Sequence, residues 1–261
     1  MLSALRFKLA RSRRLKFSSS TRLSLLRNVF KSRRCFIIGN GPSLRISDLD
    51  RIKENNELTI ASNKIYLAFD ETKWRPTIYT VADWCVAENN LETIQKLDLF
   101  KLFPTEFVPF FAQSAHGVAV FFKQFVPTER SEEDYVSYFY SDLSEGAFVG
   151  ETITNLNIQV ATHLGCNPIY LIGVDGSYSV PESRTSNPYY NEVLVSEGER
   201  NHFSEDYRTP GETWSVPRIS CHEKNYALSY SELKKRNVTL ANASRKTEIK
   251  SLPRIDFDSL F

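Results

Sequence analysis

Two histidines offer acid–base chemistry in this chain. His202 lies in "NHFSEDY" and His222 in "CHEKN", within and just after a segment rich in Ser, Glu, Pro, Asn and Tyr. An ordinary imidazole titrates near pH 6.5, so it can accept a proton from a hydroxyl group at neutral pH. A surface or helix-capping histidine is the alternative reading of both. His163 falls inside a helical pattern, which indicates a structural role, and His116 has no identifiable partner in the sequence.

Polar side chains directly follow three runs of strand-forming residues. Asn40 ends the run in "CFIIGNGPSL", Asn63 follows "LTIAS", and Asp83 ends "TIYTVAD". The glycines beside Asn40 let backbone amides approach a ligand closely, at the sheet edge where open α/β folds bind theirs. The spacing lacks the third glycine of a dinucleotide fingerprint and the GK[ST] of a P-loop. A plain strand-to-helix turn is therefore the alternative.

Two further stretches extend this polar edge. "VGETIT" (149–154) precedes a helical pattern, so Gly150, Thr152 and Thr154 can bring hydroxyls and free backbone amides to a phosphate. An ordinary helix N-cap is the alternative, because threonine often serves as one. "GVDGSY" (173–178) adds another polar strand end. Together these stretches predict a polar crevice along one edge of a sheet.

The elements that would position these residues alternate between strand and helix. Helical patterns separate several short apolar runs, which lie at residues 35–39, 58–62, 77–83, 169–175 and 237–243. This alternation predicts an α/β fold with a mostly parallel sheet. No repeat or linker interrupts residues 35–261, so we expect one folded unit there. The stretch 176–218 has no clear period, which favours a lid or binding loop.

Length and composition narrow the possibilities. The 261 residues, 41% of them hydrophobic, suffice for one large domain with a full core. No run approaches the roughly 18 apolar residues of a membrane span, and no signal-peptide pattern opens the chain, so we expect a cytoplasmic protein. Four cysteines lie far apart without a CxxC spacing, which argues against a zinc site and a disulfide scaffold. We expect them to be reduced, partly buried and inert.

The charge of the chain is unevenly distributed. Residues 1–34 carry 11 Lys or Arg and no acid, whereas the remainder holds 22 basic against 31 acidic residues. Leu and Phe alternate with these basic residues at partly helical spacing, as in a helix that lies on an anionic membrane. We therefore expect peripheral contact with the inner membrane, with a disordered solubilising tail as the alternative. Nucleic-acid binding is disfavoured because the rest of the chain has no basic stripe with interleaved aromatics.

Several motifs resemble known families in their order and spacing. "IIGNGPSL", "SNKIY", "LGCNPIYLIGVD" and "CHEKN" resemble the small bacterial CMP-sialic acid sialyltransferases of glycosyltransferase family 42. "RPTIYTVAD", "IYLIGVDGSY", "NHFSEDY" and "PRIDFDSLF" look still more like the wider domain of unknown function 115. That family is related to the archaeal 6-hydroxymethylpterin diphosphokinases and occurs among bacterial surface-polysaccharide proteins. The resemblance covers roughly residues 35–258.

The sialyltransferase resemblance implies a Rossmann-like catalytic domain and transfer without a metal or other cofactor. It implies a CMP donor held by Asn40 and Asn63, with Asp83 where the family has a third asparagine. It also implies that His222 matches the catalytic base, whereas His202 falls in the lid motif of the wider family as base or donor clamp. The residues expected around the donor are Gly39, Asn40, Gly41, Pro42, Ser43, Asn63, Asp83, Gly150, Thr152, Thr154, Gly173, Asp175, Ser177 and Tyr178.

Three functions therefore compete. The leading hypothesis is a glycosyltransferase that moves a sialic-acid-like (nonulosonic) or related sugar from a CMP donor to a cell-surface glycan, a lipid-linked precursor or a protein. The principal rival is an ATP- and Mg²⁺-dependent diphosphokinase, for which the sequence offers no clear cluster of acids. The third is a non-catalytic, membrane-bound scaffold for polysaccharide assembly. The sequence leaves an oligomer possible.

Overall fold

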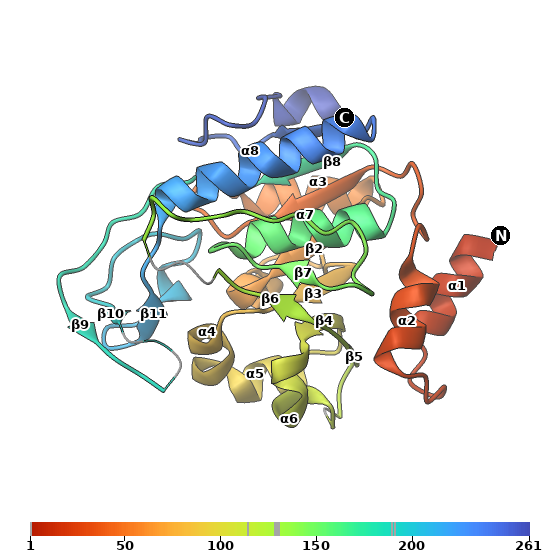
Figure 1. Ribbon diagram of the computed structural model, residues 1–261, viewed down its shortest axis with the longest axis horizontal. Coiled ribbons are helices and arrows are strands. Elements are labelled where there is room, and N and C mark those ends of the chain that lie inside the picture. Colours follow the sequence, from red (N-terminus) through yellow and green to blue (C-terminus); the bar gives the residue numbers. More distant parts are fainter. Residues whose placement is uncertain (1, 114, 128–130, 189, 191) are drawn as a thin grey trace.

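The computed structural model describes residues 2–113, 115–127, 131–188, 190 and 192–261. At its centre lies a parallel sheet of seven strands in the order β12-β8-β1-β2-β3-β4-β5 (Figure 1). The strands are β1 (Cys35–Ile38), β2 (Leu58–Ser62), β3 (Ile78–Thr80), β4 (Phe100–Pro104), β5 (Val118–Phe122), β8 (Ile169–Ile172) and β12 (Leu240–Asn242). All of them except β5 are buried along their whole length, as expected of a parallel sheet covered on both faces.

Each of the five apolar runs contains a strand of this sheet, so the predicted α/β, Rossmann-like fold is confirmed. The strands β4 and β5, at one end of the sheet, were not predicted from the sequence. The sequence of β4, "FKLFP", includes Lys101, which is buried and donates from Nζ to the carbonyl oxygen of Ile94 at 2.8 Å. A lysine and a proline within five residues hide the apolar character of this strand.

Helices pack on both faces of the sheet. One face is covered by α7 (Ile153–His163) and α8 (Ile219–Lys235), which lie in front of the sheet in Figure 1. The elements on the other face are α3 (Ile46–Glu54), η1 (Asn63–Asp70), α4 (Trp84–Asn89), α5 (Leu91–Lys96), η2 (Thr105–Phe107), α6 (Val108–Phe111) and η4 (Phe257–Leu260). Alternate residues of β1 join opposite cores, Cys35 and Ile37 beneath α7, Phe36 and Ile38 beneath α3.

The order of the strands reverses between β1 and β8. From β1 the chain adds β2 to β5 on one side, and it then returns to add β8 and β12 on the other. In open α/β sheets, ligands bind beyond the carboxyl ends of the strands at such a reversal. The loops after β1 and β8 touch there, because the amide of Gly41 donates to the carbonyl oxygen of Gly173 at 2.8 Å. The fold thus locates the predicted crevice between these two loops.

Gly39→Ala is expected to destabilise the protein by about 2–3 kcal/mol, because a methyl group has no room at this contact. A Cβ at Gly39 would overlap the carbonyl oxygen of Gly173 and lie 2.8 Å from its carbonyl carbon. Urea unfolding followed by circular dichroism measures the loss. The control is Gly211→Ala, where no atom lies within 4 Å of the new Cβ and only the left-handed backbone (φ +90°) resists the change. An equal loss in both variants would contradict this account of the loop contact.

The basic N-terminal segment packs on the folded core. It forms α1 (Leu2–Ala10) and α2 (Ser19–Leu26), and Leu23 and Leu26 are buried in the same core as Ile37. The guanidinium of Arg22 is buried and donates to the carbonyl oxygens of Leu15 at 2.7 Å and Ser12 at 3.1 Å, which fixes the link between the two helices. Residues on both sides of the boundary expected at residue 34 thus contribute to one hydrophobic core.

The predicted lid, residues 176–218, contains a small antiparallel sheet. Its strands are β9 (Arg184–Thr185), β10 (Val193–Val195) and β11 (Thr213–Ser215), followed along the chain by α8; η3 (Glu205–Tyr207) lies between β10 and β11. This sheet stands at one end of the molecule (Figure 1). A separate short pair, β6 (Gln124–Phe125) and β7 (Ala147–Phe148), lies beside α7.

Two expectations from composition can be compared with the described residues. All four cysteines are buried and none forms a disulfide. Over the described part of the chain, the helices are too short or too polar for any of them to cross a membrane.

Candidate functional site

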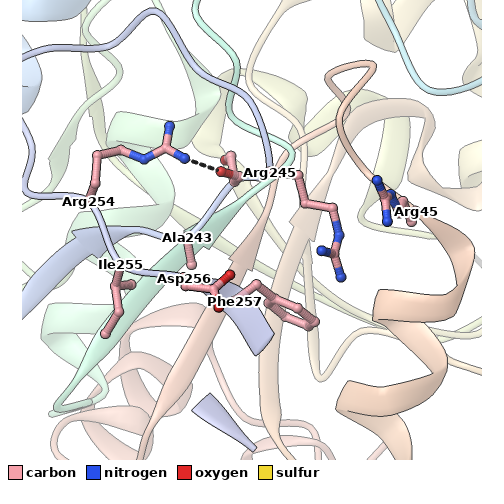
Figure 2. A pocket seen from close by; sticks show the side chains of 8 residues that line it. Arg45, Ala243, Arg245, Arg254, Ile255, Asp256 and Phe257 are labelled. Atoms are coloured by element: carbon pink, nitrogen blue, oxygen red, sulfur yellow. Dashed lines mark hydrogen bonds between the residues drawn. The ribbon is translucent and has the colours of Figure 1, made fainter. Parts of the chain in front are cut away.

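One hollow, of about 410 Å³, lies beside the end of β12 and is lined by Arg45, Arg245 and Arg254 (Figure 2). Arg245 is neutralised by two carboxylates, that of Asp48 at 2.6 Å and that of Asp258 at 3.0 Å. Arg254 donates to a backbone carbonyl at 2.7 Å. Since the predicted site residues lie elsewhere, the crevice between the loops after β1 and β8 is the stronger candidate.

The crevice holds a small cavity of about 90 Å³, which brings most of the predicted site residues together. The predicted residues that line it are Gly39, Asn40, Gly41, Asn63, Thr152, Thr154, Gly173, Asp175, Ser177, Tyr178, His202 and His222. They come from the ends of β1, β2 and β8, the start of α7, the lid and the start of α8. Pro42, Ser43, Asp83 and Gly150 do not line it.

Asn40 and Asn63 follow the neighbouring strands β1 and β2. Asn40 donates from Nδ2 to the carbonyl oxygen of Ser62 at 3.2 Å, which ties the two strand ends together. The Oδ1 atoms of both asparagines are buried, and neither has a hydrogen-bond partner among the described residues. Because buried polar atoms are nearly always paired, two unpaired acceptors beside one cavity indicate a place for a ligand that donates hydrogen bonds. Base amino groups and ribose hydroxyls are such donors.

Asp175 joins the loop after β8 to the loop after β1. Its Oδ2 accepts a hydrogen bond from the backbone N–H of Ser43 at 2.8 Å, and its Oδ1 accepts one from the Ser43 hydroxyl. Burial raises the pKa of the Asp175 carboxyl, and the bonds from Ser43 oppose that rise. Ser43 therefore does not line the crevice, but it holds the carboxylate of Asp175 in place there.

Two threonines at the start of α7 line the cavity. The hydroxyl of Thr152 accepts from the backbone N–H of Thr154 at 3.3 Å, and both residues line the cavity. Gly150 lies behind them with a left-handed backbone (φ +60°), and its carbonyl accepts from the buried side chain of Asn225. Free amides and the positive end of the helix dipole give this helix start the chemistry of a phosphate site.

His222 lies in the first turn of α8 and only 5% of it is exposed. Its Nε2 is 2.9 Å from the carbonyl oxygen of Glu151, so that nitrogen carries the proton and donates. Nδ1 keeps its lone pair. Burial lowers the pKa of His222, which keeps the ring neutral at pH 7. Glu151 holds this carbonyl in place with a left-handed backbone (φ +63°) and an ion pair to Arg218.

His202 lies in the lid and also faces the cavity. Its ring stacks on Tyr207, with ring centres 3.6 Å apart and planes 6° apart. Burial, together with the positive charges of Arg208 and Lys64, lowers the pKa of His202 far below its ordinary value. The ring is therefore neutral and held face to face with an aromatic neighbour. This geometry suits a residue that covers the donor better than one that moves to accept a proton.

A larger cavity of about 590 Å³ lies on the other side of the two histidines. Both cavities are lined by Asn63, Thr152, Ile153, Tyr178, His202, Tyr207 and His222, so these residues mark the boundary between them. Asp83 lines only the larger cavity, where it caps α4 and accepts from the hydroxyl of Ser215 at 2.6 Å. Trp84, Tyr190 and Trp214 add aromatic surface there. Asp83, which was predicted to be the third residue that contacts the sugar donor, therefore lies in the larger cavity.

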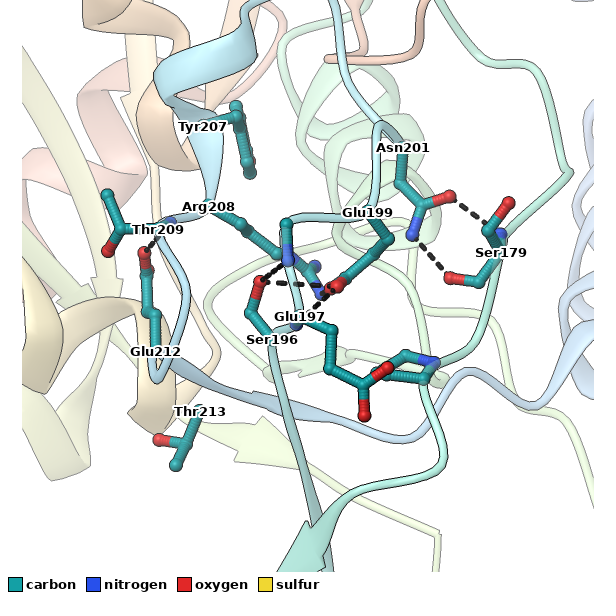
Figure 3. Close-up of polar contacts among 12 residues, drawn as sticks. Ser179, Ser196, Glu197, Glu199, Asn201, Tyr207, Arg208, Thr209, Glu212 and Thr213 are labelled. Atoms are coloured by element: carbon teal, nitrogen blue, oxygen red, sulfur yellow. Dashed lines mark hydrogen bonds and ion pairs between the residues drawn. The ribbon is translucent and has the colours of Figure 1, made fainter.

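Polar contacts hold the lid against the crevice. Within the lid, Asn201 bonds twice to the backbone of Ser179, with both distances 2.7 Å (Figure 3). Lys64, at the start of η1, donates to the carbonyl oxygen of Tyr207 at 2.7 Å and to Glu212. The amide of Phe203 donates to the carbonyl oxygen of Asn40 at 2.9 Å. Ligand pockets generally hold about 300–1,000 Å³. A nucleotide therefore enters the small cavity only if these contacts open.

Several residues of the site were missed by the sequence analysis. Asn201, Tyr207 and Tyr226 line the small cavity, and Lys64 and Arg208 line the larger one. Asn201 and Tyr207 belong to the quoted "NHFSEDY" motif, which offered a signal for them. Arg208 and Trp214 lie in the lid, whose lack of periodicity gave none. Within the described ranges, no group of three or more His, Cys, Asp or Glu side chains is arranged to hold a metal ion.

Known proteins resemble the chain in two ways. Residues 13–181 match a protein-family model described as "6-hydroxymethylpterin diphosphokinase MptE-like". Among solved structures, the MAf glycosyltransferase from Magnetospirillum magneticum AMB-1 is similar in fold, with a TM-score of 0.56 and 16% sequence identity. The match covers 100% of this chain and 38% of that one, so the chain spans well under half of the length of its structural relative. No curated protein matches the chain.

Proposed function

The chain belongs to the 6-hydroxymethylpterin diphosphokinase MptE-like family, and on that premise we propose that it is a glycosyltransferase with a CMP-activated donor. The sugar that it moves is sialic-acid-like (nonulosonic) or related, and the acceptor is a cell-surface glycan or its precursor. The observation that carries this proposal is the pair of unpaired amide oxygens of Asn40 and Asn63 beside neutral His222. The fold shared with the MAf glycosyltransferase is consistent with it.

The two cavities suggest how donor and acceptor are arranged. The nucleoside binds in the small cavity, where Asn40 and Asn63 accept hydrogen bonds from it. Its phosphate lies at the start of α7, where the hydroxyls of Thr152 and Thr154 line the cavity and the positive end of the helix dipole favours an anion. The sugar then lies at the boundary beside His222. The acceptor enters through the larger cavity, whose aromatic side chains suit the apolar face of a sugar ring.

In the transfer step, His222 acts as the general base. Its Nδ1 takes the proton of the acceptor hydroxyl while the hydroxyl oxygen bonds to the anomeric carbon. The bond from that carbon to the phosphate oxygen breaks, and CMP leaves with the electron pair. The hydrogen bond from Nε2 to the carbonyl of Glu151 orients the ring and stabilises the imidazolium that forms. Donors at the start of α7 stabilise the charge that grows on the departing phosphate.

Titration calorimetry on the whole chain tests the donor class. We expect CMP and CMP-N-acetylneuraminic acid to bind with a stoichiometry of one, without a requirement for Mg²⁺. UMP serves as the control because it shares the ribose and phosphate and differs in the base. Absence of CMP binding, or binding of UMP equal to that of CMP, would contradict the proposed donor.

A diphosphokinase is the second candidate, because the family description names that activity. Such an enzyme transfers a diphosphate from ATP and releases AMP, with metal ions neutralising the phosphates. Binding of ATP and Mg²⁺ in the same titrations, with no heat from CMP, would favour this candidate over the transferase.

We also propose that the N-terminal segment contacts an anionic membrane. Leu2 and Leu5 are 71% and 52% exposed, and Phe17 is 37% exposed. The exposed basic side chains beside them are those of Lys8, Arg11, Arg13, Arg14 and Lys16. Apolar side chains next to basic ones are the pattern of a helix that lies on an anionic surface. The other basic residues of the segment include Arg22 and Arg34, which bond within the protein.

Changing Lys8, Arg14 and Lys16 to alanine is expected to weaken binding to anionic vesicles about 100-fold, since each basic residue near the surface contributes about 1 kcal/mol. Point changes are needed because a deletion of residues 1–34 would also remove buried Leu23 and Leu26. Co-sedimentation with phosphatidylserine vesicles at low and high salt measures the effect. The matched control replaces the exposed Lys53, Lys73 and Lys96. Equal sedimentation of the two triple variants would contradict the proposal.

A further inference from the structure

Arg208 in the lid is a largely buried cation that has no hydrogen-bonded partner among the described residues. Its side chain is 12% exposed and lines the larger cavity. Across the described residues no hydrogen bond involves its guanidinium, and its Nη1 is fully buried and unpaired. The nearest carboxylate oxygen, on Glu199, lies 3.8 Å from Nη1, beyond hydrogen-bond distance. A buried guanidinium that lacks these bonds costs stability, which is explained if a ligand supplies them.

Glu199 cannot be counted as the natural partner of this cation. Its Oε2 accepts from the backbone N–H of Glu197 at 2.9 Å and from the hydroxyl of Ser196 at 3.2 Å (Figure 3). These bonds hold the carboxylate in its own turn. Its Oε1 is also buried and unpaired within the described chain. The two charges therefore face each other across a gap, in the lid.

Trp214 holds Arg208 in a fixed place. The guanidinium carbon lies 3.4 Å from the centre of the Trp214 ring, as in a stacked cation–π contact. Trp214 is only 5% exposed, and its Nε1 has no hydrogen-bond partner among the described residues. Both residues line the larger cavity. Each of the two side chains that line this cavity therefore carries a buried N–H donor without a partner among the described residues.

Tyr178 lies between this pair and the proposed reacting centre. The Trp214 ring is 6.4 Å from the ring of Tyr178, and the Tyr178 ring is 6.2 Å from His222. Arg208 and His202 both line the larger cavity, and the charge of Arg208 helps to lower the pKa of His202. Lys64, the other cation of this cavity, is already bound to Glu212 at 2.8 Å. Among the described residues that line this cavity, Arg208 is thus the cation without a hydrogen-bonded partner.

We propose that Arg208 binds the carboxylate of the transferred sugar, with Trp214 as a second donor, so that the enzyme selects acidic sugars. This inference rests on the proposed function, since it assumes a CMP donor in the crevice. A planar guanidinium and a carboxylate form paired hydrogen bonds, and the pairing satisfies donors that are otherwise buried and unbonded. A neutral sugar leaves them unpaired. The donor phosphate has its own donors at the start of α7.

The test compares three probes by titration calorimetry on the whole chain. They are CMP, CMP-N-acetylneuraminic acid and the methyl ester of that donor, which lacks the negative carboxylate. The wild-type protein is expected to bind the acid about 10- to 100-fold more tightly than the ester, the usual range for a hydrogen bond to a charged group. Arg208→Gln is expected to remove this preference and to leave the affinities for CMP and for the ester within about twofold of wild type, a difference well below that range.

Arg200→Gln is the matched control. Arg200 lies in the same lid, but it is 77% exposed and pairs with the equally exposed Glu205. This variant is expected to keep the full preference for the acid. Unchanged CMP affinity in Arg208→Gln also shows that the variant is folded.

Three outcomes would overturn the inference. If Arg208→Gln weakens CMP and both donors by the same factor, Arg208 closes the lid or contacts the phosphate instead. If the wild-type protein binds the acid and the ester equally tightly, the protein has no binding site for the sugar carboxylate and the inference is wrong. The proposal of a CMP-activated donor is not affected by that result. If the wild-type protein binds none of the three probes, both the inference and the proposed function are wrong.

Discussion

His222→Ala is expected to lower turnover of a CMP-sugar by about 10²–10⁴-fold, the usual contribution of a general base. Donor affinity should change little, because the ring takes the proton only in the transition state. Steady-state kinetics separates the two effects. The structural reason is the neutral, buried ring, whose Nε2 is committed to the carbonyl oxygen of Glu151 and whose Nδ1 is the basic nitrogen.

The pH profile adds a signature that loss of structure would not produce. A base must be unprotonated to act, and burial lowers the pKa of His222 below the ordinary value of 6.5. The acidic limb of kcat/KM in the wild-type protein should therefore lie below pH 6.5, and activity should persist at a pH where an exposed histidine is half protonated. Added imidazole should restore part of the turnover of His222→Ala.

His202→Ala is the matched comparison, since both histidines line both cavities. If His202 covers the donor through its stack on Tyr207, its loss should raise the donor KM more than it lowers kcat. Wild-type turnover in His222→Ala, with its acidic limb intact, would show that the base is another residue. Collapse of kcat in His202→Ala alone would assign that role to the lid histidine.

Asn40→Ala and Asn63→Gly are each expected to weaken CMP binding by about 1–3 kcal/mol, or about 10- to 100-fold, because a donor on the nucleoside then lacks its acceptor. Glycine is the better replacement at Asn63, whose backbone is left-handed (φ +56°). The two Oδ1 atoms are unpaired among the described residues, whereas Asn40→Ala also removes the bond from Nδ2 to the carbonyl oxygen of Ser62. Calorimetry with CMP measures the loss.

The control for this pair is Asn237→Gly. Asn237 has the same left-handed backbone (φ +55°) but is exposed just after the last residue of α8, whereas the crevice is lined by the start of that helix. Its replacement should leave CMP affinity unchanged. Wild-type affinity in both crevice variants would mean that the nucleotide binds elsewhere.

The sheet and its polar edge could be predicted because each rests on a local pattern. A buried parallel strand is a continuous apolar run, and Asn40, Asn63 and Asp175 follow such runs directly. Parallel strands bring their carboxyl ends to one edge, so residues distant in sequence meet there. His222 could be placed because its motif opens a long amphipathic helix. Asp83 also follows a strand, but its carboxylate caps α4 and accepts a hydrogen bond from Ser215 in the larger cavity.

The features that could not be predicted depend on contacts between distant segments. From the sequence, Arg22 is expected to be exposed like its basic neighbours. In the structure its guanidinium is buried, because it donates to backbone carbonyl oxygens of the link between α1 and α2. The strand β4 contains Lys101, whose charge is accommodated by carbonyl oxygens. Arg208 and Trp214 lie six residues apart in a segment without a period, and only the folded lid stacks one on the other. Short-range patterns carry no signal for such contacts.

The central claim is that a CMP-activated sugar, rather than ATP, is the substrate held beyond β1 and β8. In one competition experiment, the purified chain is incubated with equal amounts of CMP-N-acetylneuraminic acid and ATP in the presence of Mg²⁺, with water as the acceptor hydroxyl, and the phosphorus products are followed by ³¹P NMR. CMP is expected to appear as the sugar is transferred to water, about 10²–10⁴-fold more slowly in His222→Ala, while ATP is left intact. Release of AMP from ATP while the CMP-sugar stays whole would contradict it.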